Sequence, residues 1–302
     1  MTLHSDLNLE QLLRSTESHN PNFLHNVANF YSKMRIMPDI ITGITLAFRA
    51  RYLAFFFWIT TFLVAGAVMA AQFSGRQPAT VALDLGISII RIGLPIMAAI
   101  ILQEILSREF DRKFFLTCLT YPRPRHVFLI GRFIAANILA LALLITLGFV
   151  LAAVTALISA GYEQSTPPAI GTHYAVTLSF IALDLLATLS IGTLIAVSAA
   201  TPSFVFVGTI GFTLIARSYS SILELLTLNS TLVADAHTYK SSLSLLGYVF
   251  PDLAALDVRT IALYGKWEMM PSDWEARVIS ALAYALGALG LATWALSRKT
   301  FD

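Results

Sequence analysis

Residues 133–162 read FIAANILALALLITLGFVLAAVTALISAGY, thirty consecutive residues without a charged side chain. A helix rises about 1.5 Å per residue and the hydrocarbon core of a bilayer is about 30 Å thick, so a crossing takes roughly 20 apolar residues. This stretch is long enough to cross a membrane with some tilt. We expect a helix because lipid offers no partner for unpaired backbone groups.

The whole chain shares this apolar character. Of its 302 residues 57% are hydrophobic and 13% are charged, whereas a soluble domain has roughly 45–50% and about 25%. So many apolar residues cannot all be buried in one globular core. The single cysteine, Cys118, excludes an internal disulfide and a zinc cluster built on cysteines.

Six stretches are long and apolar enough to cross a membrane. They are residues 52–75, 86–106, 133–162, 173–200, 202–223 and 278–297. The second carries Arg91 and Glu104, and a tight turn at Thr201 and Pro202 separates the fourth from the fifth. The sequence therefore predicts an all-α, polytopic membrane protein with six transmembrane helices.

Basic residues predict which side of the membrane each connection faces. Lys33, Arg35, Arg49 and Arg51 precede the first span, Arg298 and Lys299 follow the last, and Arg108, Arg112, Lys113, Arg123, Arg125 and Arg132 lie between the second and third. Under the positive-inside rule these segments face the cytoplasm. The first thirty residues lack the pattern of a secretory signal. We therefore expect both termini in the cytoplasm.

The chain divides into residues 1–51, a cytoplasmic segment, and residues 52–302, the six-helix transmembrane domain. Ile40, Ile41, Ile44 and Phe48 recur at helical spacing, which predicts an amphipathic helix on the inner membrane surface. The alternative is that these residues begin the first membrane helix.

The long segment at about 224–277, before the last span, is expected outside. It mixes apolar patches with charges, which predicts short helices on or in the outer leaflet. We interpret its Asp252 and Asp257 as solvated or helix-capping residues.

The connection between the second and third spans carries the main functional signal. Phe110, Phe114, Phe115, Cys118 and Leu119 recur every three or four residues, which predicts a short amphipathic helix. Pro122 and Pro124 end it. A helix held there, at the cytoplasmic mouth of two spans, is suited to receive a push from a soluble partner.

This connection resembles that of the permease subunits of type-2 ABC transporters, closest to the multicopper-enzyme-maturation permease branch. In that pattern an acid precedes a Leu-rich turn, a Pro-x-x-Arg step and a Gly-Lys pair. Glu109 stands at the acid, Leu116 and Leu119 in the turn, Pro122 and Arg125 at the step, and Gly131 and Arg132 at the pair. Where many members have Gly-Thr after the acid, this chain has Asp111, Arg112 and Lys113.

The resemblance implies a transport subunit of the bacterial inner membrane that is not itself an enzyme. The sequence has no Gly-x-x-x-x-Gly-Lys-Ser/Thr phosphate loop, so ATP and Mg²⁺ are expected on a separate ATPase subunit. A second permease copy, identical or related, and membrane lipids are the other expected partners, with no nucleic acid. The implied coupling residues are Glu109, Arg112, Phe115, Leu119, Pro122, Arg125 and Arg132. The basic ones serve equally well as topology-setting charges.

Asp184 lies near the middle of the fourth predicted span. An ionised carboxylate there costs about 2.5–3.5 kcal/mol unless it is paired. Arg91 and Arg217, in the outer parts of their spans, are within reach, so we expect Asp184 to pair with one of them inside the helix bundle. Such a pair orients helices or meets substrate.

Two other classes of function stay open. In a secondary transporter, Arg91, Asp184 and Arg217 would be the coupling charges; in a membrane scaffold nothing is transported. The six histidines are scattered, and no pair has metal-ligand spacing. Lipids, glycans, drugs and peptides are all open as substrates.

Overall fold

The computed structural model describes residues 36–49, 52–107, 125–161, 164, 167–199, 201–228 and 251–298. Within these ranges every regular element is a helix, in agreement with the predicted all-α class. The elements are α3 (Met37–Arg49), α4 (Tyr52–Phe73), α5 (Pro78–Leu102) with a π-helical turn η1 (Gln103–Ser107), α8 (Arg125–Ala160), α9 (Thr172–Ser198), α10 (Pro202–Leu228), the 3₁₀ turn η2 (Ala254–Leu256), α12 (Arg259–Tyr264), the 3₁₀ turn η3 (Trp267–Met269) and α13 (Trp274–Arg298).

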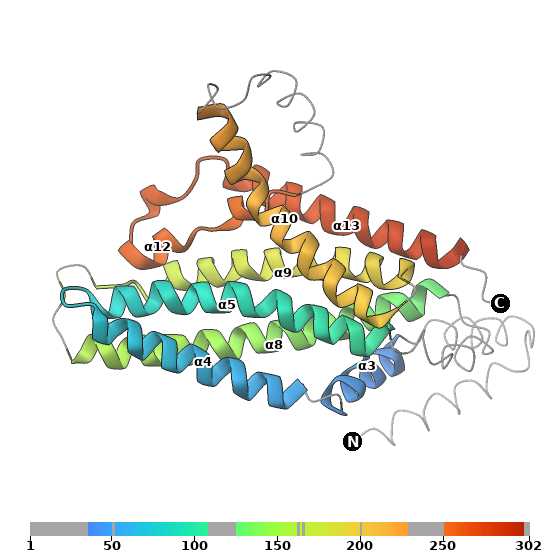
Figure 1. Cartoon of the computed structure of the whole chain (residues 1–302), viewed down its shortest axis with the longest axis horizontal. Coiled ribbons are helices and arrows are strands. Elements are labelled where there is room, and N and C mark those ends of the chain that lie inside the picture. The colour runs from blue at the N-terminus through green and yellow to red at the C-terminus, as the bar shows by residue number, and fades with distance from the viewer. Residues whose placement is uncertain are drawn as a thin grey trace, which may run out of the picture.

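Five of these helices are long and apolar enough to cross a membrane: Tyr52–Phe73, Pro78–Leu106, Arg125–Ala160, Thr172–Ser198 and Trp274–Arg298. They run side by side along the length of the molecule (Figure 1). The chain is therefore a membrane-embedded helical protein. Helix α10 has 27 residues and is not among the five; it crosses the others at an angle (Figure 1).

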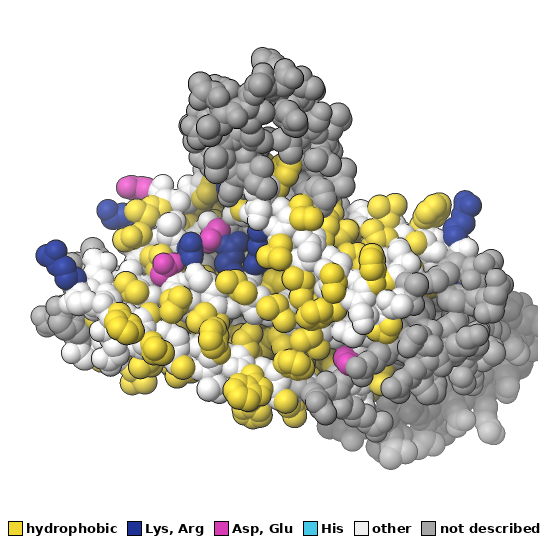
Figure 2. Space-filling view, in the orientation of Figure 1, with side chains coloured by type: hydrophobic (Ala, Val, Ile, Leu, Met, Phe, Trp, Pro, Cys, Tyr) yellow, Lys and Arg dark blue, Asp and Glu magenta, His cyan; other side chains and the backbone are white. Residues whose placement is uncertain are grey.

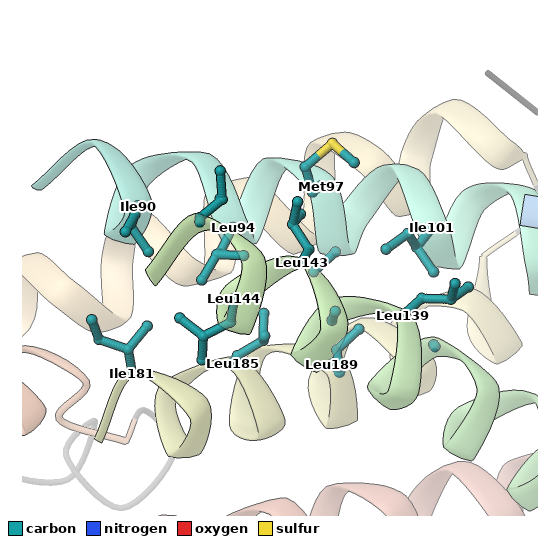
Figure 3. Packing of buried hydrophobic residues seen from close by; sticks show 14 of the residues in the cluster. Ile90, Leu94, Met97, Ile101, Leu139, Leu143, Leu144, Ile181, Leu185 and Leu189 are labelled. Carbon is teal, nitrogen blue, oxygen red and sulfur yellow. The ribbon is translucent and has the colours of Figure 1, made fainter. Parts of the chain in front are cut away.

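Helices α5, α8 and α9 form the apolar centre of the bundle. Figure 3 shows their side chains meeting, with Ile90 and Leu94 from α5, Leu143 from α8, and Ile181 and Leu185 from α9. Helices α4 and α13 lie outside this centre and turn many large apolar side chains outward. Such outward faces are expected in a protein whose surroundings are lipid tails.

The helix ends fall into two groups. At one end the backbone N–H of Ala169, before α9, donates to the carbonyl of Ala262 in α12 at 2.9 Å, and the hydroxyl of Thr80 lies 3.3 Å from Gln164 Oε1. At the other end the first residue of α8, Arg125, donates from Nη1 to the carbonyl of Leu296, near the end of α13, at 3.4 Å. The start of α5, the residues before α9 and helix α12, which belongs to the segment predicted to lie outside, thus share one end of the bundle.

Several helices begin before the apolar stretch that predicted them. Helix α5 starts at Pro78, not near residue 86, and α8 starts at Arg125, not at residue 133. Proline suits the first turn of a helix because its missing N–H would have no helical partner there. The predicted turn between the fourth and fifth spans is confirmed, since α9 ends at Ser198 and α10 begins at Pro202.

The predicted N-terminal helix is confirmed as α3, a separate element from α4. It packs on the first turns of α8, where Arg132 is 2% exposed. The guanidinium of Arg132 donates from Nη1 to the carbonyl of Asp39 at 3.1 Å and lies 5.3 Å from the ring centroid of Phe128. This buried arginine holds α3 against the bundle.

Gly131 allows α3 to approach α8 closely. A Cβ atom on Gly131 would lie 2.7 Å from the Cβ of Asp39, whereas one on Gly287 of α13 would meet nothing within 4 Å. In a helix Ala is about 1 kcal/mol more favourable than Gly, but overpacking costs about 1–3 kcal/mol. We expect Gly131→Ala to lower the thermal unfolding temperature in detergent, while the control Gly287→Ala leaves it unchanged or raises it. Equal effects at both positions would mean that α3 does not depend on this contact.

Candidate functional site

Asp184 lies in the middle of α9 with 2% of its side chain exposed. Its Oδ2 accepts a hydrogen bond at 2.6 Å from Nη2 of Arg217, which comes from α10. Nη2 of Arg91, from α5, lies 3.8 Å from the same oxygen. The structure therefore brings the three intramembrane charges together, and Asp184 pairs with both arginines where the sequence analysis expected one.

A proline in α5 leaves one backbone carbonyl of that helix free to accept a hydrogen bond from Arg217. Pro95 has no N–H, so the helical hydrogen bond that residue 95 would donate to the carbonyl of Arg91 cannot form. Nη1 of Arg217 donates to that carbonyl at 2.6 Å. One guanidinium thus binds the carboxylate of α9 and the freed carbonyl of α5, and so fixes α10 against both helices.

Residues 251–273 are the described part of the segment predicted to lie outside, and we call them the outer segment. Two of their side chains continue the set of charges. Nη1 of Arg91 forms an ion pair with Oδ2 of Asp257, and its Nη2 donates to the carbonyl of Leu253 at 3.3 Å. Nε of Arg259 lies 3.4 Å from the same oxygen of Asp257. Arg259 also returns to α5, where its Nη1 lies 3.1 Å from Oδ1 of Asp84 and donates to the hydroxyl of Ser88 at 2.7 Å.

These six side chains make up what we call the ion-pair group: Asp84, Arg91, Asp184, Arg217, Asp257 and Arg259. Three arginines balance three aspartates. Exposure rises along the group from 2% at Asp184 through 28% at Asp257 to 48% at Asp84. Figure 2 shows Lys or Arg and Asp or Glu side chains gathered beneath the outer part of α10, on a surface otherwise largely hydrophobic.

The inner part of the group is costly to break. Two charges taken out of water are compensated only when geometry and hydrogen bonding are good, and removing one partner leaves an uncompensated buried charge. The Arg217 contacts meet this requirement, yet Oδ1 of Asp184 and Nε of Arg217 have no hydrogen-bond partner. The group can therefore hold α5, α9 and α10 in a fixed orientation. It also leaves buried polar atoms in their interface that can form a hydrogen bond with a further partner.

The interpretation of Asp257 as a solvated or capping residue covers only part of its role. It does accept from the backbone N–H of Arg259 at 3.3 Å, but its other oxygen pairs with Arg91. For Asp252 the expected role is confirmed, since its Oδ1 accepts from the backbone N–H of Ala255 at 3.1 Å. Charge balance was the signal available in the sequence: two membrane arginines and one aspartate leave a positive charge that needs a second acid.

The outer pair of the group should contribute little to stability. Arg259 and Asp84 have 36% and 48% of their side chains exposed, and exposed ion pairs contribute about 0.2–1 kcal/mol. We expect Arg259→Gln to lower the free energy of unfolding by less than about 1 kcal/mol, as measured by denaturant unfolding in detergent micelles. A loss as large as that from removing Asp184 would mean that the whole group acts as one unit.

The outer segment has a second basic side chain that binds it together. Arg277, in the first turn of α13, donates from Nη1 to the carbonyl of Ala255 at 2.8 Å, and its Nη2 lies 2.9 Å from Oδ1 of Asp273. The hydrogen bond from Arg277 lowers the pKa of Asp273 below its usual value. The Asp273 contact is therefore kept at neutral pH and is lost only in acid, as the pH falls through that lowered pKa.

The predicted coupling residues are described only in part. Glu109, Arg112, Phe115, Leu119 and Pro122 lie outside the described residues. Arg125 and Arg132 both lie at the start of α8, where Arg125 binds the end of α13 and Arg132 binds α3. They join the start of α8, the helix that follows the segment 108–124, to α13 and α3.

The residues that the structure describes contain no group of three His, Cys, Asp or Glu side chains placed to hold a metal ion. His173 instead stacks on Trp267, with ring centroids 4.3 Å apart. No protein-family model matches the sequence, and a search of curated proteins gives no match either.

Proposed function

We propose that this chain is the membrane-spanning permease subunit of a type-2 ABC transporter, an exporter in a bacterial inner membrane, driven by ATP hydrolysed on a separate subunit. The observation that carries the proposal is the segment from Glu109 to Arg132, with its acid, Leu-rich turn, Pro-x-x-Arg step and Gly-Arg pair. This segment follows α5 and runs into the first turns of α8, two helices of membrane length, as a coupling element between two spans would.

The arrangement of helix ends supports six crossings with α10 as the fifth. The start of α8 and the end of α13 meet through Arg125 and Leu296, and the start of α9 lies beside α12 at the opposite end. The start of α13 lies at this opposite end too, since Arg277 binds Ala255. In this proposal the chain therefore returns across the bundle between Ser198 and Trp274, and among the described helices α10 makes this return.

In this proposal both termini face the cytoplasm and the chain works as a pair, with an identical or related copy, over two ATPase subunits. Closure of the ATPases presses on the segment 108–124. The push reaches α8 directly, and α13 and α3 through Arg125 and Arg132. Helices that share such side-chain contacts move as units rather than singly.

The test is purification of the chain from native membranes with its bound partners. We expect an ATPase subunit to co-purify, and its ATP turnover after reconstitution in lipid vesicles to depend on this chain. A variant of that ATPase without its phosphate-loop lysine is the matched control and should show no turnover. An ATPase whose turnover is the same with and without this chain would contradict the proposal.

One observation favours a second candidate, a secondary transporter. Asp184 is buried between two arginines and keeps one unpartnered oxygen, Oδ1, which is the kind of intramembrane carboxylate that carries protons or ions in such proteins. Solute transport in vesicles that contain this chain and no ATPase would establish this alternative in place of the first.

A further inference from the structure

Helices α9 and α10 pack antiparallel in a register that stacks polar residues in layers. Asp184 faces Arg217 at 2.6 Å, and a Cβ atom on Gly192 would lie 3.1 Å from Oγ1 of Thr209. These two layers are eight residues apart on both helices. The intervening layer therefore contains Thr188 and Thr213, one helical turn from each neighbouring layer. We call these six residues the α9–α10 seam.

The seam is buried and its polar atoms are incompletely satisfied. Thr188, Thr209 and Thr213 are at most 3% exposed. Oγ1 of Thr213 donates to the carbonyl of Thr209 at 2.8 Å, but Oγ1 of Thr188, Oγ1 of Thr209, Oδ1 of Asp184 and Nε of Arg217 have no partner. A buried polar group without a hydrogen-bond partner lowers the stability of the fold by about 1–3 kcal/mol. Binding of water or another hydrogen-bonding group in the seam is therefore favourable.

Neighbouring interfaces of the bundle differ from the seam. The contacts among α5, α8 and α9 in Figure 3 are formed by Leu, Ile and Met. Buried hydroxyls elsewhere on these helices donate to their own helix: Thr155 to Leu151 at 2.8 Å and Thr193 to Leu189 at 2.7 Å. Among the buried threonines that the structure describes, only Thr188 and Thr209, both in the seam, lack a side-chain hydrogen bond.

The outer end of the seam is closed by charges. Arg91 holds Asp257 and the carbonyl of Leu253 over the pair of Asp184 and Arg217, and beyond this point α10 rises away from α5 and α9 (Figure 1). Asp257 is 28% exposed, against 2% for Asp184, so the closure is in contact with solvent on its outer side while the pair beneath it is buried.

We propose that the α9–α10 seam opens to water in the chain at rest and is the path of a polar substrate group, with residues 251–264 as its outer latch. The path is specific for a hydrogen-bonding group without net charge, because hydroxyls line it and the arginines and aspartates beside it balance. This inference rests on the proposed transport function and adds to it a route and a substrate class.

Thiol reactivity measures the water in the seam. The cysteine thiolate attacks the methanethiosulfonate reagent, forms a disulfide with it and displaces methanesulfinate; the thiolate forms only where water reaches the sulfur. In a chain with Cys118→Ser, single cysteines replace Thr188 and Thr213, a nearly isosteric change. The controls are Leu147→Cys in the apolar centre, fully buried, and Leu214→Cys on the outward face of α10, 61% exposed. The probe is a small methanethiosulfonate reagent that carries a hydroxyl group and no net charge, added to lipid vesicles containing the full chain.

We expect Thr188→Cys and Thr213→Cys to react at least about ten-fold faster than both Leu controls, which are surrounded by protein or by lipid. Adding Asp257→Asn should raise the seam rates several-fold further, whereas adding Asp273→Asn, whose side chain is 56% exposed and pairs with Arg277, should not. Seam rates equal to those at Leu147→Cys would overturn the inference.

The same labelling separates this inference from the proposed function, because it needs no ATPase. If the seam cysteines react in a chain that binds no ATPase, the inferred path is supported and only the ATP-driven function is contradicted. A dry seam in a chain that does stimulate an ATPase contradicts only the path.

Discussion

Replacing Asp184 by alanine is expected to lower the free energy of unfolding by about 3–5 kcal/mol. The carboxylate is 2% exposed and is the acceptor for Arg217 at 2.6 Å, so its removal leaves that guanidinium buried without a counter-charge. Arg91 is affected less because it keeps Asp257. Denaturant unfolding of the purified protein in detergent micelles, followed by tryptophan fluorescence, measures the change.

Two further variants isolate the cause. Asp252→Ala, which removes an exposed carboxylate that caps the N–H of Ala255, should cost only about 1 kcal/mol. The double variant Asp184→Leu with Arg217→Met should recover much of the loss, since an apolar pair of similar volume often replaces a buried ion pair without cost. If the free energy of unfolding of Asp184→Ala lay within about 1 kcal/mol of the wild-type value, this ion pair would not hold α9 and α10 together.

Reversing the charge at Glu109 is expected to abolish coupling while leaving the fold intact. In the resemblance to type-2 ABC permeases, Glu109 is the acid of the coupling segment, so Glu109→Lys should reduce the stimulation of the partner ATPase at least about ten-fold, equivalent to about 1.4 kcal/mol or more. The measurement is ATP turnover of the reconstituted complex as a function of permease concentration, together with the unfolding temperature of the permease.

The matched control is Glu268→Lys. Glu268 is an exposed acid of η3, at the opposite end of the bundle, and its reversal changes the net charge by the same amount. If Glu109→Lys stimulated the ATPase as strongly as the wild type does, this segment would not have its proposed role in coupling. An equal loss from both variants would show an effect of net charge in place of a specific contact.

The helices could be predicted from the sequence because lipid demands long apolar segments, and these are visible residue by residue. Their ends could not. A hydropathy pattern records where the apolar residues lie, whereas α5 and α8 extend into polar turns that begin at Pro78 and Arg125. For this reason Asp84, which precedes the apolar stretch 86–106, lies inside α5 and pairs with Arg259.

The candidate site could be predicted as far as its buried charges. Asp184 needed a partner because of its cost in the membrane, and this requirement pointed to Arg91 and Arg217. The contacts with Asp257 and Arg259 depend on the outer segment folding back over α5, which no local pattern indicates. Pro95 was a usable signal that went unread, since a proline inside a membrane helix frees the carbonyl four residues earlier, here that of Arg91.

Labelling of single cysteines in intact cells tests the central claim most directly, because the proposed function requires the segment 108–124 to face the cytoplasm. In a chain with Cys118→Ser, a membrane-impermeant maleimide should label Asp252→Cys in whole cells and Glu109→Cys only after the cells are opened. Labelling of Glu109→Cys in intact cells would place the segment outside, beyond the reach of any cytoplasmic ATPase, and would contradict the account.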